Sequence, residues 1–181
     1  MFIIIFVALH YLFNSRVTSL INSIVVSYIS IMALPQIIND DLSAYNEWGN
    51  VLAHLLFHYM LYDLYFNCGD RFDYILHHIL TLSACMYVLY FKTHYTFVLF
   101  ISVNEISTIF MALMNLKIWK TISGIMFAFT FFVSRICWLL WIAMFKSIND
   151  RFLLSLFCMH YCINVFWFYK ICNYLRHRHQ I

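Results

Sequence analysis

Long apolar runs are the feature of this sequence that most restricts its fold. A transmembrane α-helix needs about 20 consecutive, mostly apolar residues. Six segments approach that length: 17–38, 48–66, 74–91, 95–116, 121–145 and 152–175. Connections such as "KTH" and "KIWK" are short, so consecutive helices are expected to run antiparallel. The sequence therefore predicts an all-α, polytopic membrane helix bundle.

The composition of the 181-residue chain supports an integral membrane protein. Hydrophobic residues make up 64% of the chain and charged residues 10%, whereas soluble domains carry about 25% charged residues. With three glycines and one proline, the chain has few of the turn residues that a sheet needs. Helices also satisfy their own backbone hydrogen bonds in lipid, and the alternating pattern of a membrane barrel is not visible.

Residues 1–13, "MFIIIFVALHYLF", are apolar but short for a membrane span. They lack the basic start and the small-residue cleavage site of a signal peptide, so a cleaved leader is not expected. We predict a partial helix here, which would be a seventh span if it crosses the membrane. Residues 15–175 then form the transmembrane domain, and residues 176–181 form a basic tail.

The distribution of basic residues predicts the orientation in the membrane, because cytosolic loops are enriched in Lys and Arg. One side of the bundle collects Arg16, Arg71, Lys117, Lys120, Arg176 and Arg178. The other side has Lys92, Lys146 and Arg151 together with the acidic loop "NDDLSAYNE". The richer side, including the C-terminus, is predicted to be cytosolic. The net charge of +3 is scattered over loops, so nucleic acid is not an expected partner.

Ionisable side chains inside spanning helices usually face a cavity or a charged partner. Asp63, His77, His78, Glu105 and Arg135 occupy such positions. Glu105 and Arg135 have opposite charge and similar depth, so an ion pair between two helices is expected. The other three lie in the predicted cytosolic half, so a cavity opening toward that side would gather most of the group.

Adjacent residues of a helix point about 100° apart, so His77 and His78 cannot address one atom in the same way. We predict that one faces the cavity while the other hydrogen-bonds a neighbouring helix. A histidine that exchanges its proton near neutral pH can act as a general base, or as a nucleophile that accepts an acyl group. The alternative is that both only join helices through hydrogen bonds.

A second histidine pair, His54 and His58, lies one turn apart with Tyr62 on the same face. This spacing can bind a metal. The HxxHH box of membrane hydroxylases and desaturases is missing, however, so no metal site is predicted and a hydrogen-bonded helix seam is expected instead. His160 and Asn164 are expected to form a similar seam on the last helix.

The order of these features resembles the TLC domain (TRAM–LAG1–CLN8). Four stretches carry the resemblance: "SRVTSL" (15–20), "LYDLYFNCGDRFDYILHH" (61–78), "NEISTIFMALMNLK" (104–117) and "FTFFVSRI" (129–136). The resemblance implies a six-helix, lipid-handling domain of internal membranes, with the endoplasmic reticulum as the expected compartment. His77 and His78 match the positions that ceramide synthases use to N-acylate a sphingoid base with acyl-CoA.

The sequence departs from ceramide synthases on the following helix. Asn104, Glu105 and Thr108 stand where those enzymes carry a His-Asp pair and a second aspartate. The resemblance is therefore closer to TLC domain-containing proteins, and it implies a protein that handles lipids or acyl chains and influences membrane lipid composition.

Two alternatives to that function remain open. In acyl transfer, the catalytic residues would be His77, His78 and Glu105, and the supporting or substrate-binding residues would be Asp63, Asp70, Asn104 and Arg135. The partners would then be membrane lipids, a sphingoid base and acyl-CoA as co-substrate, without a cofactor. The other alternative is a non-catalytic membrane scaffold. The sequence indicates neither the lipid nor the oligomeric state.

Overall fold

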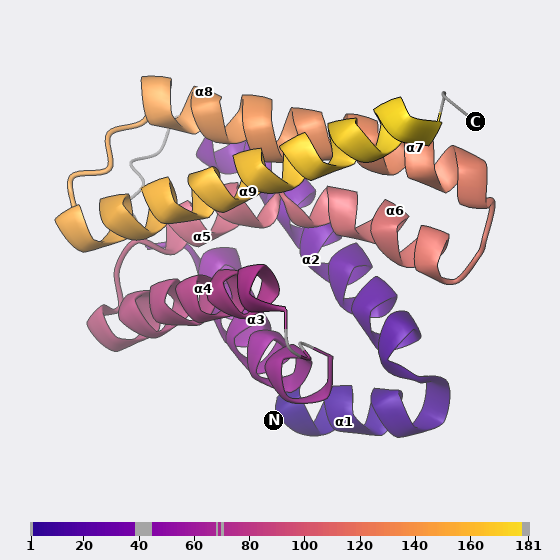
Figure 1. Cartoon of the computed structure of the whole chain (residues 1–181). Helices are drawn as coiled ribbons and strands as arrows, with labels where there is room; N and C mark the ends of the chain where they lie inside the picture. Colours follow the sequence, from indigo (N-terminus) through magenta and orange to yellow (C-terminus); the bar gives the residue numbers. More distant parts are fainter. Residues whose placement is uncertain (1, 39–44, 68, 70, 179–181) are drawn as a thin grey trace.

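The computed structural model describes residues 2–38, 45–67, 69 and 71–178, and all regular secondary structure in this part of the chain is helical. The elements are α1 (Phe2–Phe13), α2 (Ser15–Ile37), α3 (Glu47–Phe66), α4 (Phe72–Phe91), α5 (Tyr95–Ser102), α6 (Glu105–Asn115), α7 (Lys120–Phe131), η1 (Phe132–Cys137), α8 (Trp138–Phe145) and α9 (Arg151–Arg178). Elements α5 and α6 form one rod, and α7, η1 and α8 form another (Figure 1). The predicted all-α helix bundle is confirmed.

Five helices in the described part of the chain are long and apolar enough to cross a membrane. They cover Ser15–Pro35, Phe72–Phe91, Tyr95–Asn115, Lys120–Phe145 and Arg151–Arg176. The sixth predicted span, α3, has 20 residues but is not among them. Its polar residues His54, His58 and Asp63 interrupt the apolar run and lower its hydropathy. Helix α1 has 12 residues, shorter than a span, and packs against α2 and α3.

The connections gather at two ends of the bundle. In Figure 1, α2 and α7 begin and α6 and α9 end on the right, while the α4–α5 and α8–α9 connections lie on the left. The right-hand end therefore carries Arg16, Lys117, Lys120 and Arg176, four members of the richer basic set. Lys92 and Lys146 lie in the connections on the left.

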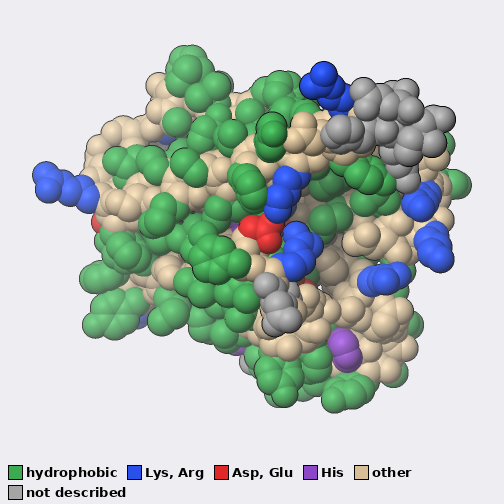
Figure 2. Space-filling model, viewed as in Figure 1, with side chains coloured by type: hydrophobic (Ala, Val, Ile, Leu, Met, Phe, Trp, Pro, Cys, Tyr) green, Lys and Arg blue, Asp and Glu red, His purple; other side chains and the backbone are tan. Residues whose placement is uncertain are grey.

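The surface is mostly apolar, while strongly polar groups are buried. Figure 2 shows hydrophobic side chains over much of the visible face, and Tyr90, Phe72 and Ile125 are 81%, 75% and 63% exposed. Arg135 and Asp63, in contrast, are 5% and 2% exposed. This distribution suits a chain whose outer surface contacts lipid.

Helix α9 is tied to α4 at its first turn. The Asp150 carboxylate accepts a hydrogen bond from the Leu153 backbone N–H at 2.9 Å, as an N-cap does. It also accepts one from the Tyr87 hydroxyl on α4. The Tyr87 hydrogen bond, followed by the Leu153 N–H, lowers the pKa of Asp150 below its ordinary value.

Glycine is required where α3 meets α5. A Cβ added to Gly49 would lie 2.2 Å from the Tyr95 carbonyl oxygen, so the two backbones leave no room for a side chain. Gly124 in α7 has a different environment, because its nearest neighbour would be the Met114 sulfur at 3.7 Å, an ordinary contact.

We expect Gly49→Ala to destabilise the protein by about 1–3 kcal/mol, because the clash is with backbone. Thermal unfolding in detergent measures this as a lower melting temperature. Gly124→Ala is the matched control and should be neutral or stabilising by roughly 0.5–1 kcal/mol, because alanine favours a helix interior. Equal melting temperatures for the two variants would contradict the close approach.

The Asp150 cap predicts a pH dependence. A carboxyl group with a lowered folded-state pKa contributes stability above its unfolded pKa, near 4, and loses it as the pH falls through the folded value. We expect the stability advantage of the wild type over Tyr87→Phe to shrink progressively as the pH falls below about 4. Melting temperatures of both proteins from pH 7 to pH 3 measure it, and a constant difference across that range would refute the assignment.

Candidate functional site

The ionisable residues that the sequence singled out converge on one cavity. This main cavity, about 220 Å³ in volume, is bounded by α3, α4, α6, α7 with η1, and α9. Asp63, His77, His78, Glu105 and Arg135 all line it.

Two further predicted residues lie elsewhere. Asn104 lines an adjoining small cavity of about 20 Å³, which shares His77, Glu105 and Arg135 with the main cavity. Asp70 lies outside the described residues.

His78 is held in place by two hydrogen bonds. Its Nδ1 lies 2.8 Å from the Tyr74 carbonyl oxygen, which can only accept, so Nδ1 carries a proton. Its Nε2 lies 2.8 Å from Asp63 Oδ2 on α3. The Tyr74 hydroxyl donates to the same Asp63 oxygen at 2.8 Å. Neither ring nitrogen is free, so His78 joins α4 to α3 and orients Asp63.

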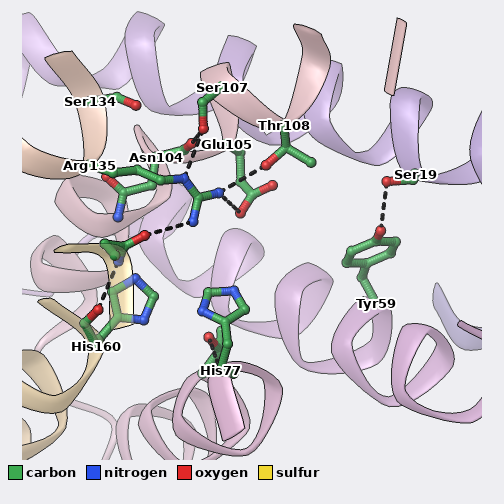
Figure 3. Close-up of polar contacts among 12 residues, drawn as sticks. Ser19, Tyr59, His77, Asn104, Glu105, Ser107, Thr108, Ser134, Arg135 and His160 are labelled. Atoms are coloured by element: carbon green, nitrogen blue, oxygen red, sulfur yellow. Dashed lines mark hydrogen bonds and ion pairs between the residues drawn. The ribbon is translucent and has the colours of Figure 1, made fainter. Parts of the chain in front are cut away.

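His77 has the opposite character. Its ring is buried at 6% exposure, and its Nδ1 has no hydrogen-bond partner in the described part of the chain. The ring packs against Trp167 and His160, with centroid distances of 5.1 and 4.9 Å. In Figure 3 it points toward the region of Glu105. Thus His77, on α4, keeps an uncommitted ring nitrogen beside the cavity, while His78 makes the interhelical hydrogen bond.

Arg135 links three rods. Its Nε donates to the Ser107 hydroxyl at 2.8 Å, and its Nη2 donates to the Thr108 hydroxyl at 3.0 Å, both on α6 (Figure 3). Its Nη1 donates to Asn164 Oδ1 on α9 at 3.2 Å. The predicted ion pair is present, with Nη2 lying 3.7 Å from Glu105 Oε1.

Glu105 is less constrained than Arg135. Its oxygens make the ion pair but accept no hydrogen bond from the described residues, so they remain available to the cavity.

Local departures from α-helix position these groups. Arg135 lies in η1, a π-helical segment, and such segments recur at functional sites. The rod of α5 and α6 breaks at Val103 and Asn104, where the Ile106 and Ser107 N–H groups bond three residues back, to Val103 and Asn104, at 3.2 and 3.3 Å. This tighter turn lies directly before Glu105.

The main cavity has a basic rim that sequence reasoning missed. Arg71 and Lys170 line the cavity, with side chains 67% and 53% exposed, and Asp73 lies 3.7 and 3.1 Å from them. Trp167 Nε1 also donates to Asp73 at 2.8 Å, which joins α4 to α9. Figure 2 shows an acidic group between basic side chains, with a hollow in the surface beside them. Asp73 stands four residues before His77, so helical spacing could have revealed it.

Apolar side chains form a large part of the lining: Met60, Met111, Phe127, Phe131, Trp167 and Ile171. The main cavity therefore combines an imidazole, a carboxylate and a guanidinium with a large apolar wall. Such a lining matches an amphipathic molecule better than a purely polar one.

The other histidine pair, His54 and His58, makes no hydrogen bond to another helix among the described residues, so the hydrogen-bonded seam stays a prediction. His58 Nδ1 hydrogen-bonds the His54 carbonyl oxygen at 2.7 Å, and His58 packs on Phe2 of α1. Tyr62 pairs with His10 of α1 at 3.0 Å. Among the described residues, no group of three or more His, Cys, Asp or Glu side chains could hold a metal ion.

These features define a polytopic α-helical membrane protein with an amphipathic cavity enclosed by its helices. A family model of the TLC domain (TRAM_LAG1_CLN8) matches residues 12–173. The chain therefore belongs to the TLC domain family and is a membrane protein involved in lipid biology. Comparisons with curated proteins and with solved structures found no match.

The Arg135–Glu105 pair generates a stability prediction. We expect Arg135→Met to destabilise the fold by about 3–5 kcal/mol, because it leaves the Glu105 charge buried without compensation. Adding Glu105→Gln should recover part of this loss. Unfolding of each variant in detergent, analysed as a double-mutant cycle, measures both effects.

Lys170→Met is the control, since exposed ion pairs contribute only about 0–1 kcal/mol. Strictly additive effects of the Arg135 and Glu105 substitutions would contradict the coupling.

Proposed function

We propose that this protein binds an acyl-chain lipid in the main cavity and thereby influences membrane lipid composition. The observation that carries the proposal is the lining itself, in which His77 and Glu105 face the same space as an apolar wall. A headgroup would meet the polar side and an alkyl chain the apolar side.

The size of the main cavity limits what it holds. Pockets for drug-sized ligands have volumes of about 300–1,000 Å³, and this cavity has about 220 Å³. It suits a headgroup and the start of a chain, with the remaining chain extending out between the helices. Arg71 and Lys170 at the rim favour a ligand with an anionic group.

Lipid profiles of cells with and without the protein test this function. We expect His77→Ala to return the profile to that of cells lacking the protein, because it removes the uncommitted imidazole. The double variant His77→Ala, His78→Ala should do the same.

His54→Ala is the matched control, since His54 is exposed and does not line the main cavity. Immunoblots of membrane fractions check that all variants insert equally. If cells with the His77→Ala variant had the same lipid profile as cells with the wild-type protein, the proposal would be refuted. If all His77 variants failed to fold, a scaffold would be favoured instead.

A second candidate function, acyl transfer, is favoured by the placement of His77 and Glu105 in the lining of the same main cavity. As a general base, His77 would take the proton of an amine or hydroxyl as that group attacks a thioester carbonyl, and the CoA thiolate would leave. Glu105 would stabilise the imidazolium, and general-base catalysis of this kind contributes about 10²–10⁴-fold. Folded protein that forms no amide from acyl-CoA and a long-chain base would reject this substrate pair.

We also propose an internal membrane, the endoplasmic reticulum, as the location, with the basic end and the C-terminus in the cytosol. The support for the orientation is the gathering of Arg16, Lys117, Lys120 and Arg176 at one end of the bundle, and the support for the location is the family to which the chain belongs.

A further inference from the structure

The small cavity beside His77 points to a ligand of its own. We propose that it holds one buried water molecule, bound by His77, His160 and Asn104, which occupies the Nδ1 side of the His77 ring. The water site stands independently of any lipid chemistry, and only the use of the His77 proton rests on the proposed function.

Residues from three elements that line this cavity carry unpartnered polar atoms. They are His77 Nδ1 on α4, His160 Nε2 on α9, and both amide atoms of Asn104 at the α5–α6 break. All are buried and without a protein hydrogen-bond partner among the described residues. Buried polar atoms in proteins are nearly always hydrogen-bonded, to protein or to ordered water.

The protein groups nearby are already committed. The Thr81 hydroxyl donates to the His77 carbonyl oxygen at 3.0 Å, and the Ser102 hydroxyl donates to the Val98 carbonyl oxygen at 2.6 Å. The Arg135 donors are directed at Ser107, Thr108 and Asn164. Glu105 also lines the small cavity and could accept from a water.

The dimensions fit one water molecule. A water needs a cavity of about 10–15 Å³ and two to four polar partners, and this cavity has about 20 Å³. The His77 and His160 ring centroids are 4.9 Å apart (Figure 3). Rings at such a separation can bring two of their nitrogens close enough to share one water through two hydrogen bonds of about 2.8 Å each.

The direction of the hydrogen bond between His77 and the water determines which His77 nitrogen carries the proton. A neutral imidazole holds one proton, and the hydrogen bond at one nitrogen sets the state of the other. If Nδ1 donates to the water, Nε2 keeps its lone pair and can receive a proton. His160 and Asn104 are then positioning residues that act on His77 through the water.

Two asparagine variants test the site by the sign of a stability change. If the cavity holds a water, Asn104→Leu removes one hydrogen-bond partner of that water and leaves the two histidine nitrogens without a partner. We expect its melting temperature in detergent to fall by about 2–4 °C, the shift for one lost buried hydrogen bond in a chain of this size. An increase, or no change, would overturn the proposal.

Asn22→Leu is the matched control. The Asn22 amide is equally buried, at 1% exposure, and unpartnered among the described residues, but it lines neither cavity beside His77. Removing an unsatisfied amide should leave the melting temperature unchanged or raise it.

A direct measurement covers the case in which Asn104→Leu does not fold. Solid-state NMR of the wild-type protein in lipid bilayers, with ¹⁵N-labelled histidine, reports transfer of magnetisation from water to each ring nitrogen. His160 is the reporter because it does not line the main cavity, and His160→Phe identifies its signals. We expect transfer from water to His160 Nε2, and its absence would overturn the water site whether or not the protein handles lipids.

Discussion

The burial of the Arg135 guanidinium is the constraint on which much of this structure depends. A charged side chain at the centre of a bilayer costs at least about 2.5–3.5 kcal/mol, so the chain must surround it with partners. Hydroxyls on α6, an amide on α9 and the Glu105 carboxylate supply them. Because the partners come from different rods, satisfying the charge also fixes how these rods pack.

The same network leaves Glu105 and His77 partly unsatisfied. Arg135 donates its hydrogen bonds to neutral groups. The Glu105 carboxylate lies 3.7 Å from Nη2 and accepts no hydrogen bond from the part of the chain that the structure describes. His77 Nδ1 likewise has no hydrogen-bond partner among the described residues, while His78 next to it is held by Asp63 and Tyr74. The fold thus assigns different tasks to two adjacent histidines, one structural and one available for a ligand.

Interruptions of regular helix concentrate near these groups. The π-helical segment around Arg135 and the tight turn before Glu105 each change the direction in which a polar side chain points. Regular helices at both places would distribute the side chains differently, so the irregularities belong to the construction of the cavity. The basic rim formed by Arg71 and Lys170 then connects this interior to the surface.

The sequence by itself determined the helices, because apolar segments in lipid must satisfy their own backbone hydrogen bonds. It also identified Asp63, His77, His78, Glu105 and Arg135, since ionisable residues are conspicuous in such segments. The family resemblance followed from the order of these residues, and the family model agrees with it. Periodicity alone also implied that two adjacent histidines face different directions.

Only the tertiary structure decided which histidine is committed, because the choice depends on Asp63 of α3 lying 2.8 Å from His78. The η1 segment and the break at Asn104 had no local signal, since they arise from packing between rods. Trp167 and Lys170 of α9 became part of the site only through their contacts with Asp73 of α4. A spacing rule describes one helix at a time, whereas a cavity is a property of several helices together.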